Sequence, residues 1–381
     1  ELDTDISNQL SEFDEVIISP GVPPDNLLLS KIKSQNIKIS TDLDLFTQFR
    51  EKSIKIIGVT GTNGKSTTCQ LLYEVLRDQN FDVRLVGNIG NPILSSKNIK
   101  KNTIFVIEAS SYQIDYSKYF ETNIALILNI APDHLERHKT FQNYVNAKLK
   151  LIKKQKKKSI ALIEKNNGLI RDILKSQKVK SKIKNVDFKE YDSFYKKIKN
   201  NYFKNLSNIK NLSFVLALSN ILKLDNSKIL KVVNSFKGLN YRQQIVYNKK
   251  KFLIINDSKS TSFSSTVPLL QSYENIYWIL GGLAKKGDKL NLNKKYFKKI
   301  KAYIYGTNKA FFLNVLKNKC RLHSSKNLKD ILSKLFLDIK KNKNEKKTIL
   351  FSPAAASFDQ FKNFEERGRY FNQLLKKYIN A

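Results

Sequence analysis

The sequence predicts an α/β protein built on parallel β-sheets, and three observations support this fold class. Short apolar runs rich in Ile and Val recur along the chain, as in IKIIGV at 54–59. Such runs are typical of strands buried on both faces of a parallel sheet. Segments with helical periodicity separate the runs, and a glycine-rich turn joins one strand directly to a helix. The chain of 381 residues is long enough for two or three such domains.

The first fifty residues contain few regular elements. We expect a strand at 15–19, an amphipathic helical segment at 27–34 and a second strand at 37–40. From residue 53 onward, strands and helices alternate, as in a parallel sheet with crossover helices. The expected strands of this part are 54–59, 104–109, 124–130 and 160–163, and the first is followed by a helix at 69–79. Residues 165–205 are lysine-rich and only weakly periodic.

The second half continues the α/β pattern. Helices are expected at 208–222 and 226–236, the latter followed by Gly238 as a helix-ending glycine. Residues 242–257 indicate a hairpin that turns at Asn248 and Lys249. Three further strands are expected at 276–280, 302–305 and 348–352. We therefore predict three α/β units at 1–50, 51–238 and 239–381, of which the first is too short to be a complete domain.

The charge balance is strongly basic, with a formal net charge of +36. This charge would suit a nucleic-acid or membrane binder. However, the chain has nine arginines against sixty lysines, and the lysines are scattered among Asn and Ile. Readers of nucleic acid favour arginine for its paired contacts, so we interpret the lysines as solvated surface and codon bias. We expect no nucleic-acid partner, although the positive field should favour anionic substrates.

Several features indicate a cytoplasmic protein with no membrane partner. No stretch approaches 18 uncharged apolar residues, and the acidic, polar start does not resemble a secretory signal. Two cysteines, Cys69 and Cys320, cannot form a disulfide framework and lack metal-ligand spacing. The chain begins at Glu1 and contains no methionine, so we expect that N-terminal sequence is missing.

The clearest motif is the segment TGTNGKSTT at 60–68, between an expected strand and an expected helix. Gly61 and Gly64 allow backbone N–H groups to wrap a phosphate, and the following helix N-terminus favours negative charge. Lys65 can reach the β- and γ-phosphates, and the Ser66 hydroxyl can ligate Mg²⁺. The usual first glycine of a P-loop is replaced by Val59, but the context still predicts a nucleotide site.

Polar residues follow two other expected strands. Glu108 ends the strand that begins at 104, and His134 follows the strand that begins at 124. Ligands of open α/β sheets bind beyond the carboxyl ends of the strands. A carboxylate and an imidazole near a P-loop suit a divalent ion that bridges phosphates.

Lys148 is unusual for its position. The expected helix at 140–154 places Phe141, Tyr144, Val145 and Ile152 on one apolar stripe, and Lys148 lies on the same stripe. A lysine there is disfavoured unless it is paired or modified, although a lysine that reaches out to solvent is an alternative.

Together these motifs resemble the Mur ligase family, and within it the branch that adds D-glutamate. The resemblance extends over nearly the whole chain. The segment SPAAASFDQFKNFEERG at 352–368 and the SPG motif at 19–21 are specific to that branch, whereas the phosphate loop is common to all Mur and folylpolyglutamate-type ligases. Further matching segments are GNIG at 87–90, IEASSYQ at 107–113, NIAPDHLERH at 129–138, AKLKLI at 147–152, GLNYRQQ at 238–244 and NDSKST at 256–261.

The resemblance implies a three-domain Mur ligase architecture. It has a truncated N-terminal domain for the UDP-substrate (1–50), a central P-loop domain for ATP (51–238) and a Rossmann-like C-terminal domain for the amino acid (239–381). It also implies catalytic residues Lys65, Glu108, His134, Lys148 and Arg242, and two Mg²⁺ ions held by Ser66, Glu108, His134 and a carbamylated Lys148. The ATP site would comprise Gly61, Thr62, Asn63, Gly64, Lys65, Ser66, Thr67, Asn208, Asn211, Arg242 and Asp257.

The substrates implied by the resemblance are ATP, UDP-N-acetylmuramoyl-L-alanine and D-glutamate, joined through an acyl phosphate by a monomeric enzyme of peptidoglycan precursor synthesis. The residues that would line the substrate sites are Ser19, Gly21, Asn88, Ser110, Lys259, Thr261, Lys285, Ser357 and Phe364. Leu283 departs from the family pattern, which often has Asp there. The alternatives are a sibling amide ligase, a basic nucleic-acid-binding NTPase and a truncated, inactive ligase.

Overall fold

The structure, a computed structural model, describes residues 10–165, 167–175, 179–249, 251–341 and 346–379. The chain forms two compact units. The first comprises Glu1–Lys197 and Asn211–Val232, and the second comprises Ile198–Lys210 and Val233–Ala381. The segment 1–50 lies within the first unit, and its assignment as a partial domain of its own remains a prediction. Among the described residues, no helix combines the length and apolar character needed to cross a membrane.

Residues 10–50 form a small parallel pair of strands with two helices. Strands β1 (Glu15–Ile17) and β2 (Lys38–Ser40) pair side by side, and helix α1 (Leu27–Ser34) connects them. The expected strand at 15–19 is therefore shorter than predicted. A further helix, α2 (Asp42–Phe49), was not expected, and Thr41 and Asp44 form a capping box at its start.

Asp44 also connects this segment to the rest of the first unit. The carboxylate is fully buried and accepts hydrogen bonds from the Ser117 hydroxyl and from the backbone N–H groups of Lys118 and Tyr119. Nearby, the Tyr116 hydroxyl and the Arg137 guanidinium both donate to the carbonyl of Val22. These bonds fix residues 10–50 against the end of α4, the loop that follows it and α5.

A six-stranded sheet, parallel throughout, forms the centre of the first unit in the order β4-β5-β3-β6-β7-β8. Its strands are β3 (Lys55–Thr60), β4 (Val83–Gly87), β5 (Ile104–Glu108), β6 (Ile124–Ile127), β7 (Ile160–Glu164) and β8 (Lys182–Val186). The four strands expected from apolar runs are confirmed. The two edge strands, β4 and β8, were not expected, because neither contains a continuous apolar run.

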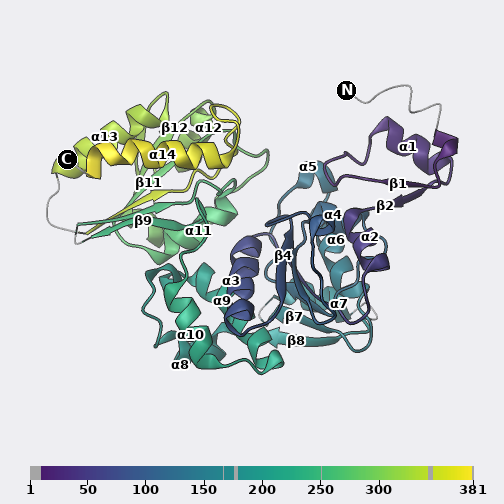
Figure 1. Ribbon diagram of the computed structural model, residues 1–381. Helices are drawn as coiled ribbons and strands as arrows, with labels where there is room; N and C mark the ends of the chain where they lie inside the picture. Colours follow the sequence, from purple (N-terminus) through teal and green to yellow (C-terminus); the bar gives the residue numbers. More distant parts are fainter. Residues whose placement is uncertain (1–9, 166, 176–178, 250, 342–345, 380–381) are drawn as a thin grey trace. The chain divides into compact units, whose positions relative to one another are not determined.

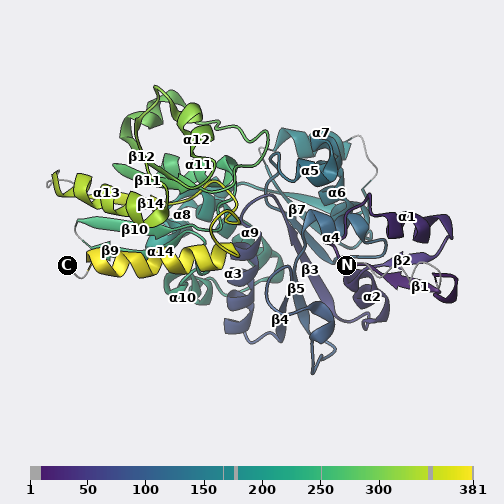
Figure 2. The same cartoon turned by 90° about the horizontal axis from the view of Figure 1, so that it is seen from above.

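Helices cover both faces of this sheet (Figures 1 and 2), with α3 on one face and α2, α4 and α6 on the other. Their bounds are α3 (Lys65–Asp78), α4 (Ser111–Tyr116), α5 (Leu135–His138), α6 (Phe141–Lys153), α7 (Gly168–Lys175) and α8 (Asp192–Tyr195). Helix α3 begins at Lys65 rather than at residue 69, so the Lys-Ser-Thr of the phosphate loop forms its first turn. Helices α9 (Leu206–Leu222) and α10 (Asn226–Ser235) are each shared between the two units.

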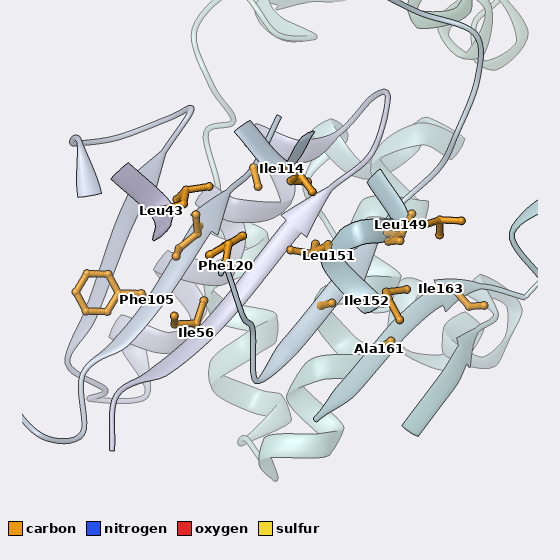
Figure 3. Packing of buried hydrophobic residues seen from close by; sticks show 14 of the residues in the cluster. Leu43, Ile56, Phe105, Ile114, Phe120, Leu149, Leu151, Ile152, Ala161 and Ile163 are labelled. Carbon is orange, nitrogen blue, oxygen red and sulfur yellow. The ribbon is translucent and has the colours of Figure 1, made fainter. Parts of the chain in front are cut away.

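The core of the first unit lies between the sheet and helices α2, α4 and α6 (Figure 3). Ile56 and Phe105 from the strands meet Leu43, Ile114, Leu149 and Ile152 from the helices. All of these side chains are almost completely buried. Each fully buried aliphatic or aromatic side chain of this kind contributes about 1.5–3 kcal/mol to folding. Helix α6 is therefore held rigidly, which fixes the position of every other residue that it carries.

The second unit contains another six-stranded sheet, in the order β13-β12-β11-β14-β10-β9. Strand β9 is antiparallel to β10, and the other neighbours are parallel. The strands are β9 (Gln244–Lys249), β10 (Phe252–Asn256), β11 (Ile276–Gly281), β12 (Ile300–Tyr305), β13 (Arg321–Ser324) and β14 (Lys347–Phe351). The expected hairpin is confirmed, but its turn was placed too early, because Asn248 and Lys249 belong to β9 and pair with Leu253 and Phe252 of β10. The turn comes after Lys249, and Lys250 lies outside the described residues. Strand β13 was not expected.

The helices of the second unit are α11 (Phe263–Ser272), α12 (Lys309–Leu316), α13 (Leu328–Lys341) and α14 (Phe364–Ile379). Two apolar clusters lie on opposite faces of its sheet, because alternate residues of β11 point to opposite sides: Tyr277 and Ile279 to one, Trp278 and Leu280 to the other. Short 3-10 helices complete the chain at η2 (Leu10–Glu12), η3 (Ile93–Ser95), η4 (Phe188–Tyr191), η5 (Asn201–Lys204) and η6 (Lys294–Lys299).

Candidate active site

The phosphate loop follows β3 and leads directly into α3. Gly64 adopts the left-handed conformation (φ 83°) immediately before the helix, which L-residues with a side chain rarely tolerate. A Cβ atom on Gly64 would lie 2.1 Å from the side-chain oxygen of Asn211 in α9. The loop is thus closely packed, and the sequence provides glycine where a side chain would be strained and would clash.

A residue that sequence reasoning missed holds the loop in shape. Asn129, just after β6, accepts a hydrogen bond from the Asn63 backbone N–H (2.8 Å) and donates to the Asn63 carbonyl (2.9 Å). The Thr62 backbone N–H donates to the carbonyl of the same Asn129 (2.9 Å). The side-chain amide of Asn129 thus pairs with both the N–H and the carbonyl of Asn63. The sequence shows no pattern that predicts this role, apart from the position of Asn129 at the end of a strand.

Lys65 lies at the first turn of α3. Its amine donates to the carbonyl oxygens of Gly61 (2.8 Å) and Thr62 (2.9 Å) within the loop. Ser66 and Thr67 follow in the same turn and are buried. The N-terminus of α3 therefore gathers a lysine, two hydroxyls and the backbone N–H groups of a helix start, which is a suitable arrangement for a phosphate chain.

The sheet order places this loop at a topological switch point. Strand β3 lies between β5 and β6. The next two strands in sequence, β4 and β5, lie on one side of it, whereas β6, β7 and β8 lie on the other side. In open α/β sheets the ligand crevice forms at this point, beyond the carboxyl ends of the strands. Glu108 ends β5, while Asn129, Asp133 and His134 follow β6. Glu108 and His134 were expected here from the sequence, whereas Asn129 and Asp133 were not singled out. The role of these residues in binding a ligand remains a prediction.

Glu108 is almost completely buried, with 1% of its surface exposed. One carboxylate oxygen accepts a hydrogen bond from the Asn88 side chain (2.9 Å), and the Asn88 backbone N–H donates to the Glu108 carbonyl (2.9 Å). The other carboxylate oxygen is buried and accepts no hydrogen bond from the described residues. A buried carboxylate oxygen without a partner is costly unless a cation is bound there, so this geometry fits a metal ligand.

Lys148 is 1% exposed, as expected from its place on the apolar stripe of α6. Its amine donates to the Gly61 carbonyl of the phosphate loop (2.9 Å) and lies 4.7 Å from the centre of the Tyr144 ring. Burial, and then the positive charge of Lys65, hold the pKa of Lys148 well below its usual value, although Asp133 and Glu108 oppose that shift. Lys148 is therefore an amine held close to the phosphate loop and easily kept neutral.

His134 occupies a left-handed backbone position (φ 54°), and its side chain is 40% exposed. Its Nδ1 lies 3.0 Å from the Tyr112 hydroxyl, and its Nε2 lies 3.5 Å from an Asp133 carboxylate oxygen. Asp133 was not singled out from the sequence, although it directly precedes His134. Within the described residues, no three His, Cys, Asp or Glu side chains converge tightly enough to hold a metal ion by themselves.

The four residues expected near the UDP-substrate all lie in the first unit. Ser19 and Gly21 are exposed in the turn after β1. Asn88 contacts Glu108 as described, and Ser110 caps α4 through a capping box with Gln113. Asn88 and Ser110 thus lie near the switch point. Their role in binding remains a prediction.

The expected adenine pair, Asn208 and Asn211, lies on helix α9, and both side chains are buried. Asn211 contacts Gly64, as noted, which places it at the phosphate loop. Asn208 instead donates through its side-chain amide to the carbonyl of Tyr202 (2.8 Å). Their contact with adenine remains a prediction.

In the second unit, most residues expected from the resemblance follow the carboxyl ends of β10, β11 and β14, whereas Arg242 directly precedes β9. Phe364 lies beside two cationic side chains: the Lys259 amine is 4.1 Å from its ring centre, and the Arg242 guanidinium carbon is 5.6 Å away. Asp257 accepts hydrogen bonds from the Gln243 backbone N–H (3.0 Å) and the Ser352 hydroxyl (2.9 Å). Burial raises the pKa of Asp257 to about 7, although these bonds oppose the shift.

The other expected pocket residues of the second unit lie in the same loops. Ser357 is buried, and its carbonyl accepts hydrogen bonds from two following backbone N–H groups, while Thr261 is partly buried. Lys285 follows the segment of Leu283, whose backbone N–H and carbonyl both pair with Ala356. The backbone of Leu283 therefore joins the loop after β11 to the loop after β14. This connection does not depend on the type of side chain at position 283.

Arg367 was not expected from the sequence and is fully buried. Its Nε donates to the Ser258 hydroxyl (3.1 Å), and one terminal nitrogen donates to the carbonyls of Ser258 (2.7 Å) and Ala355 (2.9 Å). This guanidinium thus joins the loop that carries Lys259 to the loop that carries Ser357. It acts as a positioning residue for both loops.

We expect replacement of Arg367 by lysine to lower the free energy of unfolding of the second unit by about 3 kcal/mol. An ammonium group cannot reproduce the planar set of donors, and buried carbonyls would lose their partners. Trp278, the only tryptophan of the chain, is fully buried in the second unit, so its fluorescence during urea unfolding reports this change. Arg369, two residues farther along the chain, is exposed, so Arg369→Lys provides the control. Equal midpoints for the two variants would contradict the assigned role.

Comparison with known proteins agrees with this geometry. Residues 59–238 match the Mur ligase middle domain family. The chain is 36% identical to the UDP-N-acetylmuramoylalanine--D-glutamate ligase of Rickettsia bellii, covering 95% of this chain and 84% of that protein. It is 37% identical to the ligase of the same name from Rickettsia prowazekii (96% and 86%) and 35% identical to that from Francisella philomiragia (97% and 88%).

Solved structures show the same fold at lower identity. MurF from Acinetobacter baumannii matches with a TM-score of 0.66 at 16% identity, covering 89% of this chain and 79% of that one. MurF ligase from Thermotoga maritima, solved in complex with ADP, matches with a TM-score of 0.62 at 16% identity (97% and 99%). These structures share the α/β fold of this chain, and the ligases above align with nearly its whole length. This chain therefore belongs to the Mur ligase family, in the branch of the UDP-N-acetylmuramoylalanine--D-glutamate ligases.

Proposed function

We propose that this chain joins D-glutamate to UDP-N-acetylmuramoyl-L-alanine at the expense of ATP, as a cytoplasmic, monomeric enzyme of peptidoglycan precursor synthesis. The alignment with ligases of this name over 95% of the chain carries the substrate assignment. The phosphate loop, the buried Glu108 and the buried Lys148 at one sheet edge supply the chemistry that such a reaction requires.

The reaction that fits these groups proceeds through an acyl phosphate. An oxygen of the alanine carboxylate attacks the γ-phosphorus of ATP, the bond to the β-phosphate oxygen breaks, and ADP leaves. The D-glutamate amine then attacks the activated carbonyl carbon, loses a proton, and phosphate departs with the C–O bonding pair. Because a carboxylate must approach a triphosphate, cationic groups such as Lys65 and Arg242 are needed to reduce the repulsion.

Magnesium fits this site. Ser66 in the first turn of α3 and the partnerless oxygen of Glu108 would hold a first ion, because hydroxyl and carboxylate oxygens are the ligands that Mg²⁺ prefers. When bound, the ion neutralises phosphate charge and polarises the transferred phosphoryl group. We propose that His134 and Lys148, the latter as a carbamate, contribute to a second site.

The carbamate accounts for the unusual placement of Lys148. The neutral amine nitrogen attacks the carbon of CO₂, an N–C bond forms, one C=O electron pair moves onto oxygen, and the nitrogen releases a proton. The product is an anion with two oxygens, which a cation can bind where an ammonium group could not. Burial favours this reaction because it lowers the pKa of Lys148 and so increases the share of neutral amine.

The second unit would receive the amino acid. Lys259 and Lys285 carry positive charge that suits the two carboxylates of D-glutamate. Thr261 lies in the loop of Lys259, Ser357 lies in the loop after β14, and Phe364 begins α14. Ser19, Gly21, Asn88 and Ser110 would line the path of the UDP-substrate. Arg242 would contact the γ-phosphate, and Asp257 the ribose.

Phosphate release with UDP-N-acetylmuramoyl-L-alanine and ATP tests the assignment directly. We expect turnover with D-glutamate and at least about 100-fold lower kcat/KM with L-glutamate, L-lysine or meso-diaminopimelate. Turnover with L-lysine or meso-diaminopimelate instead of D-glutamate would identify a sibling ligase. ATPase activity that depends only on added nucleic acid would reject a ligase role. Size-exclusion chromatography tests the monomer.

A further inference from the structure

A second concave site lies in the first unit. Its volume is about 890 Å³, which is within the usual range of small-molecule pockets. The walls come from α1, from β2 and the turn before it, from the end of α4, and from the last turn of α6. The lining residues are Leu29, Lys33, Asn36, Ile37, Lys38, Ile39, Asp115, Tyr116, Ser117, Lys118, Lys150, Lys153 and Lys154.

The walls of this pocket, here called the lysine pocket, are held together by specific bonds. Asp44 fixes the backbone of Lys118, and the Tyr116 hydroxyl donates to the carbonyl of Val22 (2.7 Å). The Lys154 amine donates to the carbonyl of Ser117. Because these bonds already join residues 10–50, α4 and α6 to one another, a ligand would meet a preformed cavity and would not have to order its walls.

The charge of the lysine pocket is one-sided. Six lysines line it and only one carboxylate, Asp115, which is already paired with Lys150 (2.5 Å). Lys38 is paired with Glu15 outside the lining (2.9 Å). Lys33, Lys118 and Lys153 form no ion pair with the described residues. Sixty lysines are distributed over the chain, but here they converge from three separate segments onto one hollow.

Lys154 shows how strongly this environment opposes further positive charge. Burial lowers its pKa to about 8 and the neighbouring Lys150 adds to that effect, although the carboxylates of Asp44 and Asp115 oppose the shift. A bound anion would offset both influences. The pocket therefore has unmet positive charge in a partly desolvated setting, where electrostatic attraction is stronger than on an open surface.

The lysine pocket is separate from the candidate active site. Helix α6 carries Lys148, which reaches the phosphate loop, and then Lys150, Lys153 and Lys154, which line the pocket. Lys154 lies about 9 Å farther along the helix than Lys148, at a rise of about 1.5 Å per residue. The end of α6 lies at the opposite edge of the sheet, because Gln155 donates to the carbonyls of Thr122 and Ile160, at the amino ends of β6 and β7.

We propose that the lysine pocket binds a small molecule that carries a di- or triphosphate chain, at a site distinct from the ATP site. Ammonium groups spread along the walls suit several phosphates in sequence, since each lysine acts as a mobile point charge. The volume of the pocket and the apolar contribution of Leu29, Ile37, Ile39 and Tyr116 favour a compact ligand over a nucleic-acid strand, which needs an extended groove.

Tripolyphosphate without Mg²⁺ is a suitable probe, measured by isothermal titration calorimetry on the full chain at physiological salt. Lys65→Ala is used as the background, because it weakens binding at the phosphate loop. We expect this variant to retain one binding site per chain. Adding Lys33→Gln, Lys118→Gln and Lys153→Gln together should raise the Kd at least about tenfold, because three exposed and unpaired charges are removed without disturbing the core.

The matched control removes the same amount of charge elsewhere on the first unit, as Lys52→Gln, Lys97→Gln and Lys157→Gln, all exposed. We expect its Kd to change by less than about twofold. Equal weakening in both triple variants would mean that only the overall field attracts the anion, and loss of all binding in Lys65→Ala would mean that the phosphate loop is the only site. Tighter pocket binding of a short single-stranded oligonucleotide than of tripolyphosphate would overturn the small-molecule assignment.

Discussion

Replacing Lys148 by methionine is expected to lower the rate of ligation by at least about 1,000-fold while leaving the fold intact. The proposed carbamate needs the amine, and methionine offers no equivalent group. The side chain is 1% exposed and surrounded by apolar residues of α6, so an unbranched apolar chain of similar length fits the same space.

The free energy of unfolding of Lys148→Met should not fall together with its rate of ligation. The pKa of Lys148 is lowered on folding, so the protonated amine opposes folding at any pH below its usual value. Removing it should leave the free energy of unfolding unchanged or raise it. Thermal unfolding of the Lys148→Met and wild-type chains checks this. A variant that folds normally and retains full activity would reject the proposed role.

Chemical rescue separates a missing carbamate from a missing structural contact. Lys148→Ala leaves a cavity beside Gly61, and short carboxylic acids such as acetate or propionate should restore part of the activity there. In the wild-type chain, ¹³C-labelled CO₂ should give a carbamate signal in NMR spectra that is absent from Lys148→Met. The signal and the activity should both fall as the pH falls through the lowered pKa of Lys148, because a protonated amine cannot attack CO₂.

Glu108→Gln is expected to reduce kcat by about 100- to 1,000-fold and to raise the Mg²⁺ concentration needed for half-maximal rate. The amide can still accept the hydrogen bond from Asn88, so the local structure is kept. What is lost is the negative charge of the oxygen that has no partner among the described residues. Steady-state phosphate release over a range of Mg²⁺ concentrations measures both effects.

The exposed Glu51 provides the matched control, because Glu51→Gln removes the same charge away from the phosphate loop. Its kcat and Mg²⁺ dependence should equal those of the wild-type chain. If Glu108→Gln lowered kcat without any change in the Mg²⁺ requirement, Glu108 would act on the substrates and not through a metal ion.

The sequence was sufficient to predict the central elements of both sheets. Strands such as β3 and β11 are buried on both faces, and therefore appear as continuous apolar runs. The edge strands β4, β8 and β13 contain polar or charged residues and were missed, because an edge strand needs less apolar surface. Helix α2 was missed because it is short and acidic, and its stability depends on a cap and on tertiary contacts.

The candidate site could be predicted where a motif or an anomaly marked it. The phosphate loop has a pattern, and Lys148 contradicts the polarity of its own helix face. Asn129 and Arg367 could not be found in this way, because each acts only through backbone groups far away in sequence, by 66 residues for Asn129 and 109 for the Ser258 contact of Arg367. Such roles exist only once the chain has folded.

The outermost strands of the two sheets show where part of the basic charge is placed. Strand β8 presents Lys182 and Lys184 at one border of the first sheet, and β13 presents Arg321 at a border of the second, all exposed. Unpaired strand borders invite another chain to add to the sheet, and charged side chains oppose that addition by mutual repulsion. We therefore expect these charged borders to disfavour edge-to-edge pairing with other chains, independently of any catalytic demand.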